Sequence, residues 1–165
     1  NPARNEPLPQ PEPEQPAALL AYESEQEVEL DGKKITLPAY ALKDENGYDT
    51  NYVRVRDLAE LLDGTAAQFN VDWTGSVDLT PRTAYTARNG TELNVPFGGA
   101  QPYTVYTGET KVGGAVTAFD AFTIVFNGGG HTYYKLRDLG KALGFNVGWS
   151  AERGIYIETD REYIG

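Results

Sequence analysis

Apolar and polar residues alternate along much of the chain, a pattern typical of half-buried β-strands. In the segment VELDGKKITL the alternation continues on both sides of an Asp-Gly pair, which favours a two-residue turn, so the sequence predicts a hairpin over 28–37. The runs 39–42 and 52–55 are predicted to be two further strands, joined by the polar loop 43–51.

In two short segments the period changes to that of an amphipathic helix. Apolar residues recur at i, i+3 and i+7 from Val55 to Leu62, which predicts a helix over about 56–62. Leucines have the same spacing in 136–143, which predicts a second helix. A glycine follows each segment as a stop signal. Helices this short are unstable alone in water, so each must lie against a sheet.

The two predicted helices belong to one phrase that occurs twice. NYVRVRDLAELL at 51–62 aligns without a gap with TYYKLRDLGKAL at 132–143, and the pattern FNV-x-W follows each helix and opens a closing hairpin. A hairpin around 107–108 is predicted to open the second copy. The sequence therefore predicts an α+β fold of two tandem repeats, each a small antiparallel sheet wrapped on one short helix in the order hairpin, helix, hairpin.

The boundaries follow from this duplication. Residues 28–86 are predicted to form the first repeat, 87–102 a connection and 103–165 the second repeat, while 1–27 form a Pro/Glu-rich linker or tail. Six of the ten prolines lie within 1–16. Proline fixes φ and lacks an amide donor, so this stretch is predicted to be an extended spacer, with a docking strand for a partner as the alternative.

Charge and composition exclude several classes of function. The net charge is −10, and the first 29 residues hold seven acids and one base. Nucleic-acid binding depends on a basic face, so we expect no nucleic-acid partner. The chain has no cysteine, which excludes disulfides and zinc–thiolate sites. No apolar run reaches the ~20 residues of a membrane-spanning helix, so we expect no membrane span.

The repeated Arg-Asp pair is the first candidate for chemistry. Asp57 and Asp138 could act as general bases steadied by Arg56 and Arg137. In the structural alternative, each carboxylate meets the free amides and the positive dipole end of a helix, and the arginine ties the helix to a neighbouring carbonyl. Because both copies carry the pair at the same point, we interpret these four residues as structural.

Aromatic residues are the richest set of candidate binding groups. Trp73 and Trp149 lie at equivalent strand ends, which favours a place in the core, and they complete the predicted structural signature together with the Arg-Asp pairs. Tyr48, Tyr103 and Tyr106 lie outside the repeat pattern. We expect these three tyrosines to form the surface that could bind a ligand.

The remaining polar features give weak signals. His131 follows three glycines and is predicted to lie exposed in a hairpin loop. A single histidine without cysteine cannot assemble the usual zinc or copper site. The acidic loop 43–51 lacks the spacing of a calcium-binding loop, although an adventitious calcium site remains an alternative. We therefore predict no catalytic residue, no metal site and no cofactor.

The two copies resemble a known family. AYALKDENGYDTNYVRVRDLAELLDGTAAQFNVDW and AFDAFTIVFNGGGHTYYKLRDLGKALGFNVGW resemble the repeat of copper amine oxidase N-terminal-like, or stalk, domains of secreted and cell-surface Gram-positive bacterial proteins. The resemblance covers Val28 to Tyr163 and departs from the family pattern at Val53 and Val55. It implies a five-stranded antiparallel sheet on one helix per repeat, export, and attachment beside other domains. It implies neither copper nor amine oxidation.

Three functions stay open at this point. The leading hypothesis is a non-enzymatic extracellular or cell-surface stalk, spacer or protein-interaction module that contacts other domains of a larger protein. The alternative is a module that binds cell-wall glycan or peptide through surface aromatics. A small hydrolase would need two acids from the two copies converging in one cleft with a raised pKa. The oligomeric state is unknown from the sequence.

Overall fold

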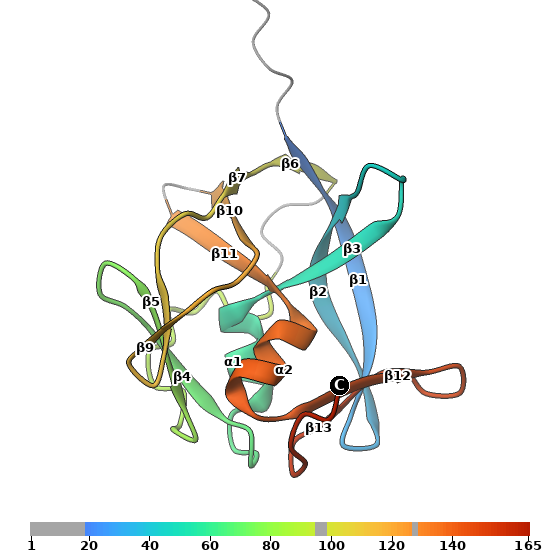
Figure 1. The fold of residues 1–165 in the computed structure, drawn as a ribbon, viewed down its shortest axis with the longest axis vertical. Helices are drawn as coiled ribbons and strands as arrows, with labels where there is room; N and C mark the ends of the chain where they lie inside the picture. The colour runs from blue at the N-terminus through green and yellow to red at the C-terminus, as the bar shows by residue number, and fades with distance from the viewer. Residues whose placement is uncertain (1–18, 95–98, 127–128) are drawn as a thin grey trace, which may run out of the picture.

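The described residues, 19–94, 99–126 and 129–165, fold mostly into β-strands in this computed structural model (Figure 1). Strands hold 51% of these residues and helices 11%. The predicted α+β fold, with a separate small sheet on the helix of each repeat, is therefore wrong. The chain forms one large and one small mixed sheet, and two short helices lie between them (Figure 1).

The first half of the chain contains β1 (Leu20–Leu30), β2 (Lys33–Lys43), β3 (Asp49–Arg54), α1 (Val55–Leu62), β4 (Phe69–Trp73) and β5 (Val77–Pro81). The second half contains β6 (Ala100–Pro102), β7 (Thr104–Val105), β8 (Thr110–Val112), β9 (Ala115–Thr117), β10 (Ala121–Phe126), β11 (Gly129–Lys135), α2 (Leu136–Leu143), β12 (Asn146–Ser150) and β13 (Gly154–Glu158). The nine-stranded sheet has the order β12-β13-β1-β2-β3-β11-β10-β7, and β6 pairs with β1. The four-stranded sheet has the order β4-β5-β8-β9.

The two copies of the repeat meet inside the large sheet. β3 and β11 are antiparallel, and Val53 pairs with Tyr134, which is its own counterpart in the alignment of the copies. On one side of this pair Tyr52 pairs with Lys135, and on the other side their counterparts Tyr133 and Arg54 pair with each other. This register is that of two units related by a twofold axis through the Val53–Tyr134 pair.

Each copy also gives its closing hairpin to the other copy. β13, at the end of the second copy, pairs in parallel with β1 of the first, and β5 of the first copy pairs in parallel with β8 of the second. Alternation of apolar and polar residues identifies a strand but not its partner. The prediction of one sheet per repeat failed because strand pairing across the copies is a long-range property.

The described chain starts in a strand earlier than the sequence indicated. β1 begins at Leu20, so residues 20–27, which the sequence analysis assigned to the tail, pair with β2 and β6. The rest of the predicted spacer, 1–18, lies outside the described residues. In the predicted connection, β6 pairs with the start of β1.

Most of the local predictions are confirmed. Both helices lie within one residue of the expected bounds, and Gly144 ends α2 in the left-handed conformation at φ 83°. Asp31 and Gly32 have φ of 47° and 89°, as the two-residue hairpin turn requires. The hairpin expected around 107–108 is not formed there, because β7 pairs with β10 and the turn between β8 and β9 lies at 113–114.

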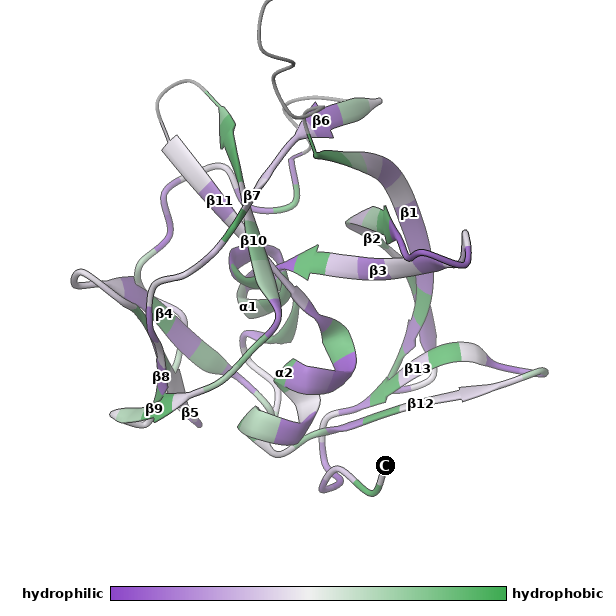
Figure 2. Ribbon diagram, turned by 45° about the horizontal axis from the view of Figure 1, so that its top comes forward, coloured by the Kyte–Doolittle hydropathy of each residue, from purple (hydrophilic) through white to green (hydrophobic). Residues whose placement is uncertain are grey.

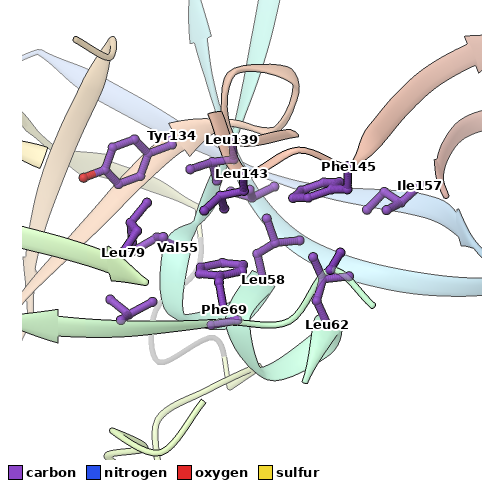
Figure 3. Packing of buried hydrophobic residues seen from close by; sticks show 14 of the residues in the cluster. Val55, Leu58, Leu62, Phe69, Leu79, Tyr134, Leu139, Leu143, Phe145 and Ile157 are labelled. Atoms are coloured by element: carbon purple, nitrogen blue, oxygen red, sulfur yellow. The ribbon is translucent and has the colours of Figure 1, made fainter. Parts of the chain in front are cut away.

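The leucines of both helices pack in a single core between the sheets (Figure 3). Leu58 and Leu62 of α1 are fully buried and belong to the same cluster as Leu139 and Leu143 of α2. Both sheets contribute to this cluster through Val28, Leu37, Phe69, Val71, Leu79, Tyr134 and Ile157. Each helix therefore depends on strands of both copies for its burial.

The large sheet has a second apolar face. Successive strand residues point to opposite sides, so Val53 and Tyr134 face the helices whereas Tyr52 and Tyr133 point away from them. On that outer side Phe122 stacks on Tyr133 with ring centroids 5.1 Å apart, and Tyr52 meets Phe122 edge-on at 4.9 Å. Figure 2 shows the change of hydropathy from residue to residue along strands such as β4.

Candidate functional site

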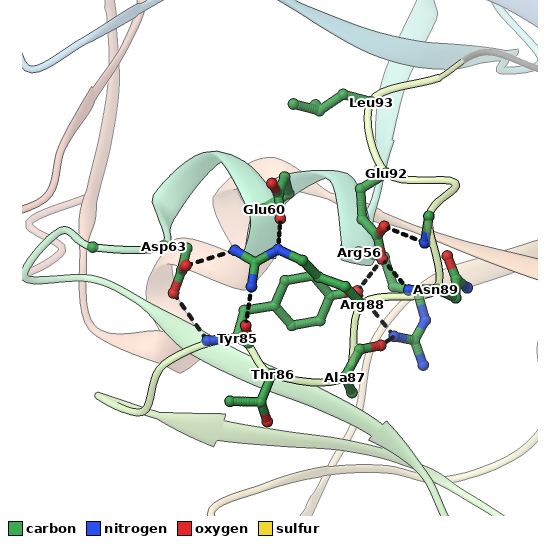
Figure 4. A network of polar contacts seen from close by, with 12 residues as sticks. Arg56, Glu60, Asp63, Tyr85, Thr86, Ala87, Arg88, Asn89, Glu92 and Leu93 are labelled. Carbon is green, nitrogen blue, oxygen red and sulfur yellow. Dashed lines mark hydrogen bonds and ion pairs between the residues drawn. The ribbon is translucent and has the colours of Figure 1, made fainter.

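The two Arg-Asp pairs have different surroundings, beginning with α1. Arg56 is half-buried and donates from Nη1 to the hydroxyl of Tyr85 at 3.0 Å and to the carbonyl of Ala87 at 2.9 Å. Both acceptors belong to residues 85–93, which we call the covering segment and which runs along α1 without forming a helix or strand (Figure 4). Arg56 therefore ties the helix to a neighbouring part of the chain.

Asp57 is enclosed beneath the same segment. Its Oδ1 accepts hydrogen bonds from the amide of Leu93 at 2.8 Å and from Arg54 Nη1 at 3.3 Å, so the predicted contact with free helix amides is replaced by one with Leu93. Arg54 is itself buried and donates to the carbonyl of Thr91 at 3.1 Å. Burial raises the pKa of Asp57 to about 6, although the Leu93 amide and the Arg54 guanidinium act in the opposite direction.

The covering segment also contacts the last turn of α1. Arg88 donates to Glu60 Oε2 at 2.5 Å and to Asp63 Oδ2 at 2.6 Å, and Asp63 accepts from the amide of Tyr85 at 3.0 Å (Figure 4). The segment thus runs from the C-terminal end of the helix to its first turn and uses polar groups along the whole way.

The corresponding face of α2 is open. The alignment places Arg137 and Asp138 at the positions of Arg56 and Asp57. Arg137 is exposed and Asp138 is half-buried, and among the described residues neither has a hydrogen-bond or ion-pair partner. The same two residue types are therefore engaged on one helix and available on the other.

Arg137 and Asp138 lie at the rim of a cavity of about 350 Å³. The cavity is formed by both copies of the repeat, and its apolar lining consists of Leu37, Val53, Leu136, Val147 and Ile155. Asp49, Asn51 and Lys135 add polar groups to its lining. Asp138 also borders a second depression of about 520 Å³, between Lys141 and residues 117–120.

The equivalent place beside α1 is largely filled. The cavity there has a volume of about 100 Å³ and is lined by Arg54 and Arg56 together with β4 and β11. Arg54 forms the buried pair with Asp57, whereas its counterpart Lys135 bonds to Asp120 at 3.1 Å, near the surface. Divergence at this position is one of the differences between the packed copy and the open one.

The two tryptophans are not in the core, which corrects the expectation from the sequence. Trp73 is 61% exposed at the end of β4, and Trp149 is 63% exposed in β12. Both stand at the far ends of strands in the closing hairpins. Trp73 lies on the same side of β4 as the buried Val71, and Trp149 lies on the same side of β12 as the buried Val147, so these strand ends extend past the edge of the core. Equivalent positions indicated a shared environment, but that environment is the surface.

The three candidate tyrosines fall into two places. Tyr103 and Tyr106 line one groove of about 220 Å³ with Leu42 and Phe122, and Tyr103 lies against Phe122 with ring centroids 5.0 Å apart. Tyr48 is 73% exposed at the tip of the β2–β3 hairpin and does not line that groove. The structure therefore brings together two of the three predicted ligand-binding residues.

His131 is not the exposed loop residue that the sequence predicts. It is half-buried in β11, pairs with Ile124 across the sheet and lines the small cavity beside Arg54. Burial lowers the pKa of His131 to about 4, and the positive charge of Arg54 acts in the same direction. Within the described ranges, no group of three or more potential metal ligands lies close enough to hold an ion.

Searches of protein-family models, of curated proteins and of solved structures find no match to this chain. The resemblance to stalk domains therefore stays a prediction. Neither α1 nor α2, nor any other helix in the described part of the chain, is long and apolar enough to cross a membrane.

Sequence reasoning missed two parts of the site. It treated residues 87–102 as a connection, although residues 85–93 bond along α1. It also gave no role to Arg54, whose buried pair with Asp57 has no equivalent among the described residues of the second copy. The signal for the second was present, because Arg54 aligns with Lys135 and only arginine can contact several acceptors through a planar fork.

Proposed function

We propose that this chain is a non-enzymatic spacer and protein-interaction module of a secreted or cell-surface protein. Its binding surface is the cavity beside Arg137 and Asp138. One observation carries this proposal: the Arg-Asp pair is used internally on α1, whereas its copy on α2 borders a cavity and forms no hydrogen bond or ion pair with the described residues. The resemblance to stalk domains supports export, and the lack of cysteine in the sequence is compatible with it.

The chemistry of the cavity suits a polypeptide ligand. Its apolar lining can take an apolar side chain, and a few polar groups at the rim can fix the orientation of the ligand. Arg137 can donate to a main-chain carbonyl and Asp138 can accept from a main-chain amide. These are the contacts that their counterparts make with Ala87 and Leu93.

The geometry around the acids supports a module without catalysis. Asp57, the acid with the raised pKa, is covered by residues 85–93, so a substrate cannot reach its carboxyl without displacing that segment. Incubation with panels of hydrolase and amine oxidase substrates should show no turnover. Turnover that disappears in Asp138→Asn while the fold is retained would overturn this part of the proposal.

The binding role can be tested with an array of synthetic peptides. Thr50 lines the cavity without a hydrogen bond of its own side chain in the described structure, so Thr50→Trp should fill the cavity and abolish peptide binding. Thr132→Trp is the matched control, because Thr132 lines the small cavity of the other copy. Equal binding by wild type and Thr50→Trp, or no peptide binding at all, would contradict the role of the cavity.

The second candidate function is binding of cell-wall glycan or peptide in the Tyr103–Tyr106 groove. The observation that favours it is the meeting of these tyrosines with apolar residues in one groove at the edge of the large sheet. Aromatic faces bind sugar rings through apolar contact. Binding to isolated cell walls should fall in Tyr106→Ala and persist in Tyr48→Ala, whose tyrosine lies elsewhere. If the wild-type protein does not bind isolated cell walls, this second function is ruled out.

A further inference from the structure

We propose that the open face of α2 binds an extended, acidic peptide segment of a partner protein. This segment would lie along α2 as residues 85–93 lie along α1. The inference rests on the proposed function and deepens it, because it names the path, the direction and the charge of the ligand. The contacts of residues 85–93 with α1 serve as the template for the ligand of α2. Where the two helices differ in sequence, the ligand should differ from residues 85–93.

The chain approaches both helix faces in the same way. The amide of Thr86 donates to Oδ1 of Asn70 at 2.9 Å, and the amide of Ile164 donates to Oδ1 of Asn146 at 3.3 Å. Asn70 and Asn146 occupy the same position in the two FNV-x-W patterns. Ile164 therefore lies where Thr86 lies, and the open face of α2 corresponds to the place that residues 88–93 take on α1.

The main chain of the ligand would be held by a donor and an acceptor that both helices carry. On α1, Arg56 donates a hydrogen bond to the carbonyl of Ala87, and Asp57 accepts one from the amide of Leu93. Arg137 and Asp138 repeat this donor and acceptor on α2 at the same helical spacing. A segment with that backbone path would satisfy both groups, whatever its side chains, and its apolar residues would enter the two depressions that flank Asp138.

The charges on the two helices determine which charge the ligand should carry. On α1, Arg88 bonds to two acids, Glu60 and Asp63. The alignment places Lys141 at the position of Glu60 and a glycine at the position of Asp63. The charge at these two positions is therefore negative on α1 and positive on α2. Lys141 is exposed, and no described residue bonds to it. A segment that fits α2 should therefore carry Asp or Glu where the covering segment carries Arg88.

The experiment uses two fluorescent synthetic peptides with the sequence of residues 84–94. One is unchanged and the other contains Arg88→Glu. Fluorescence polarisation on the whole chain should give a Kd for the Arg88→Glu peptide that is about three- to tenfold lower, since an ion pair at the surface adds only a modest affinity. The preference should weaken as salt is raised from 50 to 500 mM.

The decisive variant is Lys141→Glu, which is at the surface and leaves the core untouched. It should reverse the preference, so that the unchanged peptide binds more tightly. Lys111→Glu, on β8 of the small sheet, is the matched control and should retain the preference for the acidic peptide. Arg137→Ala should weaken both peptides about three- to tenfold, because the carbonyl contact does not depend on the side chain at position 88.

The outcomes separate this inference from the proposed function. Peptides that bind in a Thr50→Trp-sensitive way but ignore both Lys141→Glu and peptide charge would retain the module and overturn the path along α2. Self-association that Lys141→Glu abolishes would assign this face to a second copy of the chain and overturn the partner. Binding that appears only after removal of residues 1–18 would assign the face to the chain's own N-terminal segment, which also overturns it.

Discussion

The two signature arginines should differ in their contribution to stability, although the sequence presents them as equivalent. Arg56 is half-buried and its Nη1 contacts Tyr85 and Ala87. Arg137 is exposed, and within the described residues it has no partner. The perturbation is the same alanine substitution at each position, so helix propensity and charge change by the same amount in both variants.

The magnitude follows from the contacts that are lost. A hydrogen bond to a charged group contributes about 1.5–3 kcal/mol, and partial exposure places the cost of Arg56→Ala at about 1–3 kcal/mol. An exposed side chain without a partner contributes within about 0.5 kcal/mol, which is the expectation for Arg137→Ala. For a chain of this size, a difference of 1 kcal/mol corresponds to a shift in Tm of about 2–4 °C.

Urea unfolding followed by tryptophan fluorescence and circular dichroism would measure both variants in parallel. The slope with urea should stay unchanged, so that the shift in midpoint reports stability alone. Tyr85→Phe is a useful comparison, because it removes one acceptor of Arg56 together with the donor to Glu92 and leaves the contact of Arg56 with Ala87 in place. Equal losses in the two alanine variants, or a larger loss in Arg137→Ala, would refute the assignment of a structural role to one arginine only.

Three further predictions use the same measurement. Gly140→Ala should destabilise by about 1–3 kcal/mol, because a Cβ there would lie 2.7 Å from Val147 Cγ2; a gain in stability, usual for alanine in a helix, would show that the packing relaxes. Burial lowers the pKa of His131 to about 4 and raises that of Asp57 to about 6. As pH falls from 6 to 4, the histidine contribution to the free energy of unfolding therefore decreases while the aspartate contribution increases. Relative to wild type, His131→Phe should gain stability toward acid and Asp57→Asn should lose it, and parallel pH profiles would contradict both shifts. Trp149→Ala should change stability by less than about 0.5 kcal/mol, since the side chain is 63% exposed; a loss of several kcal/mol would place it in a packed interface.

The elements that depend on neighbours in sequence could be predicted. The i, i+3, i+7 spacing from Val55 to Leu62 placed α1, and the same spacing placed α2, because a short helix must present one apolar stripe to the core. The Asp-Gly pair at 31–32 fixed the first hairpin, since its turn needs two residues with positive φ. These are local requirements, and each is written in a few adjacent residues.

The pairing of strands could not be predicted in the same way. β5 and β13 have the composition of ordinary hairpin strands, and nothing in their residues indicates that each adds to the sheet of the other copy. The exposure of Trp73 and Trp149 depends on the same long-range arrangement, because it decides how far the ends of β4 and β12 extend past the core. The candidate site could not be predicted for the same reason, since its cavity is lined by strands from both copies.

The duplication itself explains why a binding surface can arise on α2 without loss of the fold. Arg54 and Arg56 hold the covering segment on α1, and this copy contributes packing. Leu139 and Leu143 of α2 are buried in the shared core, so α2 is held there without a covering segment, although Leu136 is only half-buried. Its outer face is therefore free to differ in sequence, and it differs at Lys141, while Lys135 differs at the end of the preceding strand; both changes would alter what this side of the molecule binds.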